Sequence, residues 1–215
     1  MARSLKKLIA AVFCLVLLFE LSSCSVNTKS AEQTGFSMGS LVGIKLYGKN
    51  SEALENANLL AEVVKTDERI SKNYEGSDIY RVNSSGEHGE TVSSETYDEL
   101  RTVCDVYSDS HGKAAALSGA LTELWGFDTD EFRLPSEDEI LSAKEKCGDD
   151  KLIFDDGKKV YIPDGAKLNL GSAGKGIALD EAVKRIDEIN SQGGKITGAV
   201  ISVGGSVATY GLSLI

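Results

Sequence analysis

The chain has 215 residues and carries 33 acidic against 23 basic side chains, a net charge of −10. This acidic balance argues against nucleic acid as a partner, because phosphate backbones are bound by clustered Lys and Arg. Beyond its N-terminal segment the chain keeps roughly 180 residues, which is enough for one hydrophobic core.

The N-terminus is typical of an exported lipoprotein. A basic start precedes an apolar run over residues 8–21, which is short for a helix that crosses a bilayer and needs about 20 residues. The run ends in Leu-Ser-Ser-Cys, which resembles a bacterial lipobox and predicts cleavage before Cys24 and lipid on its thiol. An uncleaved anchor with an incidental cysteine is the alternative.

This N-terminus predicts a protein held at the cell membrane by its lipid, on the extracytoplasmic side. The residues after Cys24 are small and polar, as in a flexible tether. We therefore expect three segments: a signal peptide over 1–23, a tether over 24–35 and a folded domain over 36–215.

Periodicity and turn residues predict a mixture of helices and strands in the folded domain. In chain order, we expect a strand over 35–48, helices over 51–71, 93–110 and 135–146, a hairpin over 151–163, a strand over 167–170, a helix over 173–189 and two strands over 196–211. The elements do not alternate strictly as βαβ units. The pattern therefore predicts an α+β fold: a mixed, largely antiparallel sheet with flanking helices.

Cysteine and histidine residues add little. Loss of the signal peptide and lipidation leave Cys104 and Cys147, which could form a disulfide in an oxidising compartment or remain free thiols. No Cys-x-x-Cys pair or His-rich cluster points to zinc.

The stretch LNLGSAGKGIALDEA, residues 168–182, places Lys175 among three glycines where a strand-like segment meets a helix. It matches neither the P-loop nor the dinucleotide fingerprint. Glycine lets a backbone approach a ligand closely, and a helix N-terminus offers unpaired N–H groups. Two interpretations stay open: an anion site, or tight strand–helix packing with Lys175 merely exposed.

Five stretches in order resemble the ApbE family of FAD:protein FMN transferases, which are often bacterial lipoproteins. They are SMGSLVGIKLYG (37–48), DERISKNYEGSDIYRVN (67–83), LTELWGF (121–127), LNLGSAGKGIALDEA (168–182) and AVISVGGSV (199–207). The resemblance implies a Mg²⁺-dependent enzyme that breaks the pyrophosphate of FAD and transfers FMN to a Ser or Thr hydroxyl of a cell-envelope protein, releasing AMP.

The resemblance also implies FAD-binding positions in this sequence. They are Met38, Asn73 or Tyr74 (where the alignment slips by one), Asn169 and Lys175. Lys175 would face the phosphates, and Asn169 stands where the family usually has an Asp. The structural alternatives are core packing for Met38, surface packing for Tyr74 and a satisfied turn for Asn169.

The chain departs from the family at further positions. Ala114 and Ala115 replace an aromatic and an acidic residue, and Ser206 replaces the residue after Gly-Gly. Ser172 would offer its carbonyl to Mg²⁺, but one carbonyl does not hold this ion, which needs several oxygen ligands. Family chains continue with an Asp, a Thr and a His at the reaction centre. The resemblance thus predicts a C-terminally truncated chain with impaired activity.

Three hypotheses follow. The first is the flavin transferase, with FAD, an acceptor protein and the membrane as its partners. The second is a non-catalytic flavin-binding lipoprotein or a relative that hydrolyses FAD. The third is a lipoprotein that shares only the fold and binds a partner through its sheet.

Overall fold

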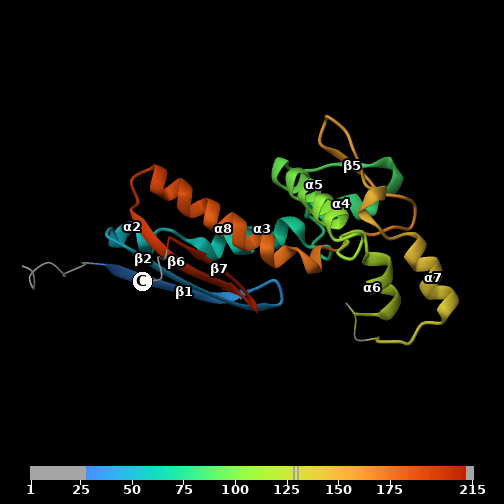
Figure 1. Cartoon of the computed structure of the whole chain (residues 1–215), viewed down its shortest axis with the longest axis horizontal. Helices are drawn as coiled ribbons and strands as arrows, with labels where there is room; N and C mark the ends of the chain where they lie inside the picture. The colour runs from blue at the N-terminus through green and yellow to red at the C-terminus, as the bar shows by residue number, and fades with distance from the viewer. Residues whose placement is uncertain (1–27, 128, 130, 212–215) are drawn as a thin grey trace, which may run out of the picture.

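The computed structural model describes residues 28–127, 129 and 131–211, so the expected signal peptide over 1–23 and Cys24 lie outside the described residues. In this part of the chain, a four-stranded sheet with helices on one face is joined to a second lobe of helices around a small sheet (Figure 1). The predicted α+β fold with a largely antiparallel sheet and flanking helices is confirmed.

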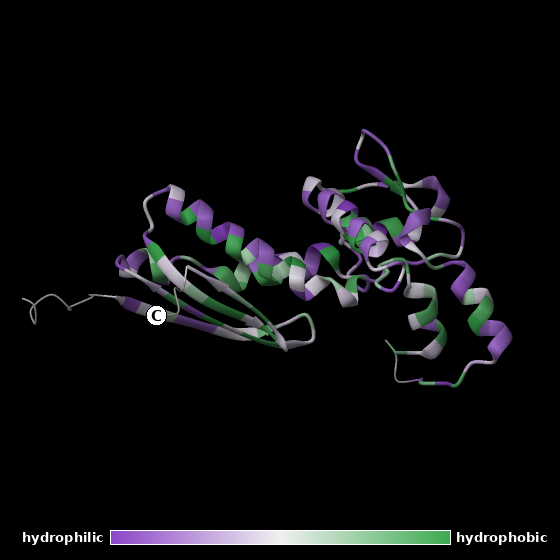
Figure 2. Ribbon diagram, viewed as in Figure 1, coloured by the Kyte–Doolittle hydropathy of each residue, from purple (hydrophilic) through white to green (hydrophobic). Residues whose placement is uncertain are grey.

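The larger sheet is antiparallel throughout and has the strand order β1-β2-β6-β7. Its strands are β1 (Lys29–Ser37), β2 (Ser40–Gly48), β6 (Ile196–Val203) and β7 (Ser206–Tyr210). Alternate residues of the two central strands face one hydrophobic core, among them Ile44, Leu46 and Ile201. Hydrophobic residues accordingly line these strands in Figure 2. The last two strands were predicted, with their break at Gly204-Gly205.

The sequence between residues 29 and 48 forms a hairpin, and two predictions were wrong there. The single strand expected over 35–48 is interrupted by a turn at Met38-Gly39. The tether expected over 24–35 is strand β1 from Lys29 onward. Its polar composition is compatible with an edge strand, and the Gln33 side chain accepts a hydrogen bond from the Leu60 N–H (3.0 Å).

Three helices cover one face of the larger sheet: α2 (Ser51–Glu55), α3 (Leu59–Ile70) and α8 (Gly174–Ser191). Apolar residues of α3 and α8 complete the core, and in Figure 2 these helices carry both hydrophobic and hydrophilic residues. The single helix predicted over 51–71 breaks because Asn58 adopts a left-handed conformation (φ 49°). Asn50 caps α2, because its side chain accepts hydrogen bonds from the N–H groups of Glu52 and Ala53.

The second lobe surrounds a separate hydrophobic core. Its helices are α4 (Asp78–Ser85), α5 (Ser94–Asp109), α6 (Gly119–Trp125) and α7 (Glu137–Glu145), with 3₁₀ turns η1 (Gly86–His88) and η2 (Asp149–Lys151). Its sheet consists of β3 (Glu90–Thr91), β4 (Ile153–Phe154) and β5 (Lys159–Tyr161). The predicted α5, α7 and β4–β5 hairpin are confirmed, and Ser136 forms the capping box of α7.

The strand predicted over 167–170 is not formed. The Asn83 side chain forms hydrogen bonds with both backbone groups of Leu168. It accepts from the N–H (2.7 Å) and donates to the carbonyl (2.9 Å). The segment therefore needs no strand partner, and it continues into the 3₁₀ helix η3 (Leu170–Ser172).

The two cysteines that could pair are both free thiols. Burial raises the pKa of the Cys104 thiol to about 11, so this thiol is protonated and unreactive at neutral pH. None of the helices between residues 28 and 211 that the structure describes combines the length and hydropathy of a bilayer-crossing segment.

Candidate functional site

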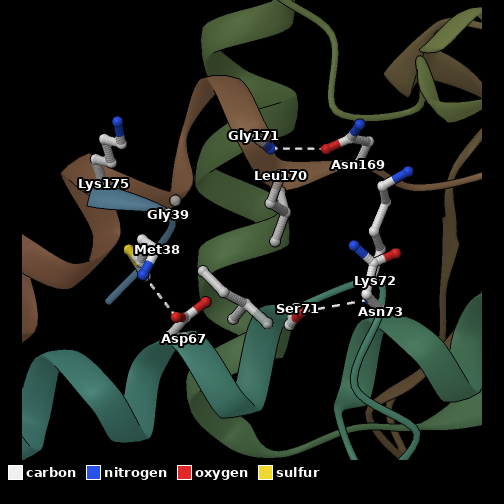
Figure 3. Close-up of a pocket in the computed structure, with 12 residues that line it drawn as sticks. Met38, Gly39, Asp67, Ser71, Lys72, Asn73, Asn169, Leu170, Gly171 and Lys175 are labelled. Atoms are coloured by element: carbon white, nitrogen blue, oxygen red, sulfur yellow. Dashed lines mark hydrogen bonds between the residues drawn. The ribbon is translucent and has the colours of Figure 1, made fainter. Parts of the chain in front are cut away.

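A hollow of about 370 Å³ opens where the β1–β2 turn, the end of α3 and the start of α8 meet (Figure 3). We call it the first hollow. It is lined by Met38, Gly39, Asp67, Ile70, Ser71, Lys72, Asn73, Asn169, Leu170, Gly171, Gly174 and Lys175. Four of the five positions matched to FAD binding lie here, although they are spread over more than a hundred residues of sequence.

Met38 is held in a strained turn at one side of the first hollow. Its φ is 52° and that of Gly39 is 64°, so both turn residues are left-handed, as in a type I′ hairpin. The Asp67 carboxylate accepts a hydrogen bond from the Met38 N–H (2.6 Å; Figure 3) and another from the Ser37 hydroxyl (2.9 Å). The Met38 side chain packs against both hydrophobic cores, which agrees with the packing alternative as well as with a ligand contact.

Lys175 lies in the first turn of α8, half-buried. No side chain caps this helix, and its first turn holds no acidic residue. A methyl group on Gly204 (φ 58°) would lie 3.0 Å from the Lys175 Nζ, so the β6–β7 turn closely approaches the amine. Within the described chain Lys175 has no ion-pair partner. A free ammonium beside an uncapped helix start suits an anion.

Asn169 lies opposite Lys175 across the first hollow (Figure 3). Its side-chain oxygen accepts from the Gly171 N–H (2.9 Å), and its amide donates to the Thr122 hydroxyl (3.0 Å). Asn169 therefore satisfies the turn into η3, as its structural alternative predicted, while its side chain still lines the hollow.

The loop after α3 separates the two alternatives that the alignment left open. Asn73 lines the first hollow, and its N–H donates to the Ser71 hydroxyl (3.3 Å) (Figure 3). Tyr74 is 53% exposed and does not line it; its ring lies beside Gly76. The geometry favours Asn73 as the position that faces a ligand.

A second hollow of about 670 Å³ adjoins the first, because Asn169 and Gly171 line both. Its wall includes Ala114, Ala115 and Ser172, together with Lys113 and Lys144. Within the described chain neither of these lysines forms an ion pair, and no Asp or Glu lines this hollow. In an acidic protein, the two hollows thus form a continuous depression with a local excess of positive charge.

The wall of the second hollow is fixed by a buried carboxylate. Asp149 is 2% exposed and accepts hydrogen bonds from the N–H groups of Ala116 (2.9 Å) and Leu117 (2.6 Å). Burial raises the pKa of Asp149, whereas these two backbone bonds oppose the rise. Asp149 therefore holds the alanine segment in place and does not face the hollow.

The surroundings of Ser172 do not fit a complete magnesium site. Across the described residues, no group of three or more His, Cys, Asp or Glu side chains is placed to hold a metal ion. Mg²⁺ prefers octahedral oxygen ligands with carboxylate support. Ser172 is exposed, and no Asp or Glu that the structure describes lines the second hollow beside it.

Several residues of the site were not predicted from the sequence. Asp67 sits in an amphipathic helix, where an acidic side chain normally indicates a solvated face. Its role depends on the β1–β2 turn, which was not predicted from the sequence. Lys113 and Lys144 come from separate loop and helix segments that only the fold brings to one hollow.

Comparisons with known proteins agree with this geometry. A family model described as the ApbE family matches residues 38–214. A FAD:protein FMN transferase of Haemophilus influenzae is 20% identical over 98% of this chain and 63% of its own length. The crystal structure of the ApbE protein of Thermotoga maritima has a TM-score of 0.74 and 26% identity, covering 84% of this chain and 59% of that chain.

The apo form of the flavinyl transferase ApbE of Pseudomonas stutzeri is similar at a TM-score of 0.73 and 24% identity, over 86% of this chain and 58% of that chain. At this identity the likeness concerns the fold alone. The chain thus spans between 58% and 63% of the length of these relatives.

Proposed function

The chain belongs to the ApbE family, and from this membership we propose that it binds FAD and transfers FMN to a Ser or Thr hydroxyl of an acceptor protein. In this reaction the acceptor oxygen forms a bond to the FMN phosphorus, the pyrophosphate P–O bond breaks, AMP leaves, and the hydroxyl proton is released to solvent. Because the chain spans less than two thirds of its relatives, the activity itself is part of the proposal.

One observation carries the proposal: Met38, Asn73, Asn169 and Lys175, matched to the family by sequence, line one hollow. Each of the two adjoining hollows has a volume within the range typical of ligand sites, about 300–1,000 Å³. A dinucleotide is elongated and doubly anionic at its centre. Two contiguous hollows with lysines and an uncapped helix start have the shape and charge that such a ligand needs.

The role of the chain's own residues is electrostatic and positional. Paired phosphates repel an approaching hydroxyl, so cationic groups must reduce their charge. Lys175 and the N–H groups of the first turn of α8 are the groups placed to do so. Asp67 holds the Met38 turn against the same hollow, and Asn169 fixes the opposite wall.

The proposed reaction includes Mg²⁺, but the described residues do not complete a site for it. The family resemblance implies Mg²⁺ as the Lewis acid of the reaction, with the Ser172 carbonyl as one ligand. Since the described residues supply no carboxylate set around Ser172, we assign no step to the ion.

We also propose that the acceptor is a cell-envelope protein and that the chain is a lipoprotein anchored through Cys24 on the extracytoplasmic side. The lipobox-like sequence supports this anchor. Because β1 begins at Lys29, only a short segment would separate the lipid from the sheet. The domain would therefore stay close to the membrane surface and act on acceptors held there.

Binding of FAD to the full chain tests the proposal, measured by flavin fluorescence anisotropy. We expect the wild-type chain to bind FAD and Lys175→Met to bind it roughly 30-fold more weakly, since a hydrogen bond to a charged group contributes about 2 kcal/mol. Lys65→Met is the matched control, because Lys65 is exposed on α3, pairs with Glu62 at 3.8 Å and does not line either hollow.

A wild-type chain that does not bind FAD, or a Lys175→Met variant that binds as well as Lys65→Met, would contradict the proposal. Products then separate the flavin-binding alternatives. A transferase yields AMP and a flavinylated acceptor, a hydrolase yields AMP and free FMN, and a non-catalytic binder leaves FAD intact.

A further inference from the structure

A groove of about 500 Å³ runs between α5 and α8, and the site described above does not use it. On α5 its lining residues recur from Ser94 through Asp98 and Thr102 to Val106, one helical turn apart. Those on α8 recur in the same way from Ala173 to Lys184. Both helices thus present one face along the groove, over about 18 Å at 1.5 Å per residue. This length suits a short peptide segment rather than a small molecule.

The floor of this groove is apolar. Val103 is buried in the second core, Ile177 packs against it, and Val106 is 50% exposed. An exposed valine beside buried aliphatic residues offers a contact for an apolar side chain.

The rim of the groove is strongly acidic. Its ionisable residues are Glu95, Asp98, Glu99, Asp180, Glu181 and Lys184. The Glu99 carboxylate is neutralised by Arg69 (2.6 Å), and Glu181 pairs with Lys184 (3.4 Å). Across the described residues, the other three carboxylates have no ion-pair partner. The rim therefore keeps a net negative charge that basic side chains would complement.

The carboxylates of the rim act on one another. Burial raises the pKa of Glu99, and the neighbouring Glu181 and Glu95 raise it further, against the effect of Arg69. No group of three or more acidic side chains in the described chain is arranged to hold a metal ion. Charges spread along a groove in this way suit several basic side chains better than one ion.

The groove lies beside the first hollow. Gly174 and Lys175 line the hollow, whereas the next two residues of α8, Gly176 and Ile177, line the groove. Successive residues of a helix rise about 1.5 Å and turn about 100°, so the groove and Lys175 lie on different sides of the same first turn of α8.

We propose that the α5–α8 groove docks a short apolar segment of the acceptor protein that bears Lys or Arg residues. The aliphatic side chains of this segment contact Val106 and Ile177, and its basic side chains face Glu95, Asp98 and Asp180. Docking brings the acceptor to the first turn of α8, which also borders the first hollow. This inference rests on the proposed function, because it identifies the partner of that reaction.

The test measures binding of a fluorescein-labelled peptide of alternating leucine and lysine to the full chain, by anisotropy. We expect Asp98→Lys/Asp180→Lys to weaken binding by about tenfold or more, because the lost attraction is replaced by repulsion. Glu87→Lys/Glu145→Lys is the matched control, since it changes the net charge equally at exposed positions outside the groove. We expect it to change binding by no more than about twofold, and higher salt to weaken wild-type binding.

Two further measurements test the specificity of peptide binding. A peptide with serine in place of leucine should bind more weakly, because it cannot use the apolar floor. Equal loss in the groove and control variants, or no loss with the serine peptide, would show attraction to an acidic surface only and overturn the inference. Peptide-independent self-association of the wild-type chain that the groove variant abolishes would assign the groove to a second copy, and would also overturn it.

The same samples separate this inference from the proposed function. The groove variant should bind FAD as the wild type does, because neither substituted residue lines a hollow. A wild-type chain that binds FAD, but binds the peptide no better than the groove variant, overturns only the docking inference. A wild-type chain that fails to bind FAD overturns the proposed function, and with it the identity of the partner.

Discussion

Asp67 is the residue on which the geometry of the first hollow depends most. A non-glycine residue in a left-handed conformation costs about 1 kcal/mol, and the Asp67 carboxylate compensates by accepting from the Met38 N–H and the Ser37 hydroxyl. We expect Asp67→Ala to lower the free energy of unfolding by about 2 kcal/mol, since both donors lose their partner. Urea denaturation measures this loss, with the exposed neighbour Glu68→Ala as control.

A second substitution checks the cause. Met38→Gly relieves the left-handed strain, so it should recover part of the stability lost in Asp67→Ala. If the glycine instead destabilises this background further, the packing of the methionine side chain outweighs the strain of its backbone.

At the residue scale, the sequence predicted those site residues that carry a matched motif. Met38, Asn73, Asn169 and Lys175 could be assigned by resemblance, and the fold brings them to one hollow. Asp67 could not be assigned from the sequence, because its hydrogen-bond partners are a backbone N–H and a hydroxyl presented by a turn. Whether the matched residues bind FAD stays a prediction.

Among the elements, α4 and α5 are joined by one carboxylate. Asp78, the first residue of α4, accepts hydrogen bonds from the N–H (3.1 Å) and the hydroxyl (2.6 Å) of Ser93, the N-cap of α5. Burial alone would raise the pKa of Asp78, but the bonds from Ser93 and Thr96 and the contact with Arg81 outweigh it and lower that pKa. The ionised carboxylate therefore stabilises the folded state.

The sign of the pH dependence follows. A carboxyl whose pKa is lowered in the folded state contributes stability above its ordinary pKa of 3.8, and this contribution is lost as the pH falls through the lowered value. We expect Asp78→Asn to be less stable than wild type by roughly 1–2 kcal/mol at pH 7. The difference should shrink below about pH 4 in urea titrations. The exposed Asp109→Asn should show no such convergence.

Elements with long periodic patterns were predictable, and those fixed by single side chains were not. Helices α5, α7 and α8 were predicted close to their observed bounds. The β1–β2 turn was missed because Met-Gly lacks the Asn-Gly or Asp-Gly signal of such turns. Residues 167–170 were mistaken for a strand because their backbone is satisfied by Asn83, far away in sequence.

At the scale of the whole molecule, the site lies at the junction of two hydrophobic cores. The length of the chain indicated enough residues for one core, whereas the described residues form two, and the Met38 side chain packs against both. Such a junction depends on contacts between residues distant in sequence, which local periodicity does not report. The geometry of the site therefore depends on the contacts between α3, which packs on the larger sheet, and α5, which belongs to the second lobe.

The ion pair between Arg69 of α3 and Glu99 of α5 makes that connection. The two terminal guanidinium nitrogens of Arg69 each donate to the Glu99 carboxylate at 2.6 Å, and one of them also donates to the Thr96 hydroxyl. Their side chains are only 15% and 13% exposed. Removing one partner of a buried pair leaves an uncompensated charge, so we expect Arg69→Met to cost about 3 kcal/mol in a denaturation experiment. The exposed pair of Arg133 and Glu139 serves as control, and Arg133→Met should cost less than about 1 kcal/mol.

The pH dependence of this variant distinguishes electrostatics from lost packing. Burial already raises the pKa of Glu99 with Arg69 present, and removing the guanidinium raises it further. A carboxyl with a raised folded-state pKa destabilises the fold as the pH rises through that value, so the deficit of Arg69→Met should be largest at neutral pH and shrink on acidification. The double variant Arg69→Met/Glu99→Gln should recover much of the loss at neutral pH, because no buried charge remains. A deficit that is independent of pH and unchanged in the double variant would show that the two lobes are held together by apolar packing, with the ion pair incidental to the geometry of the site.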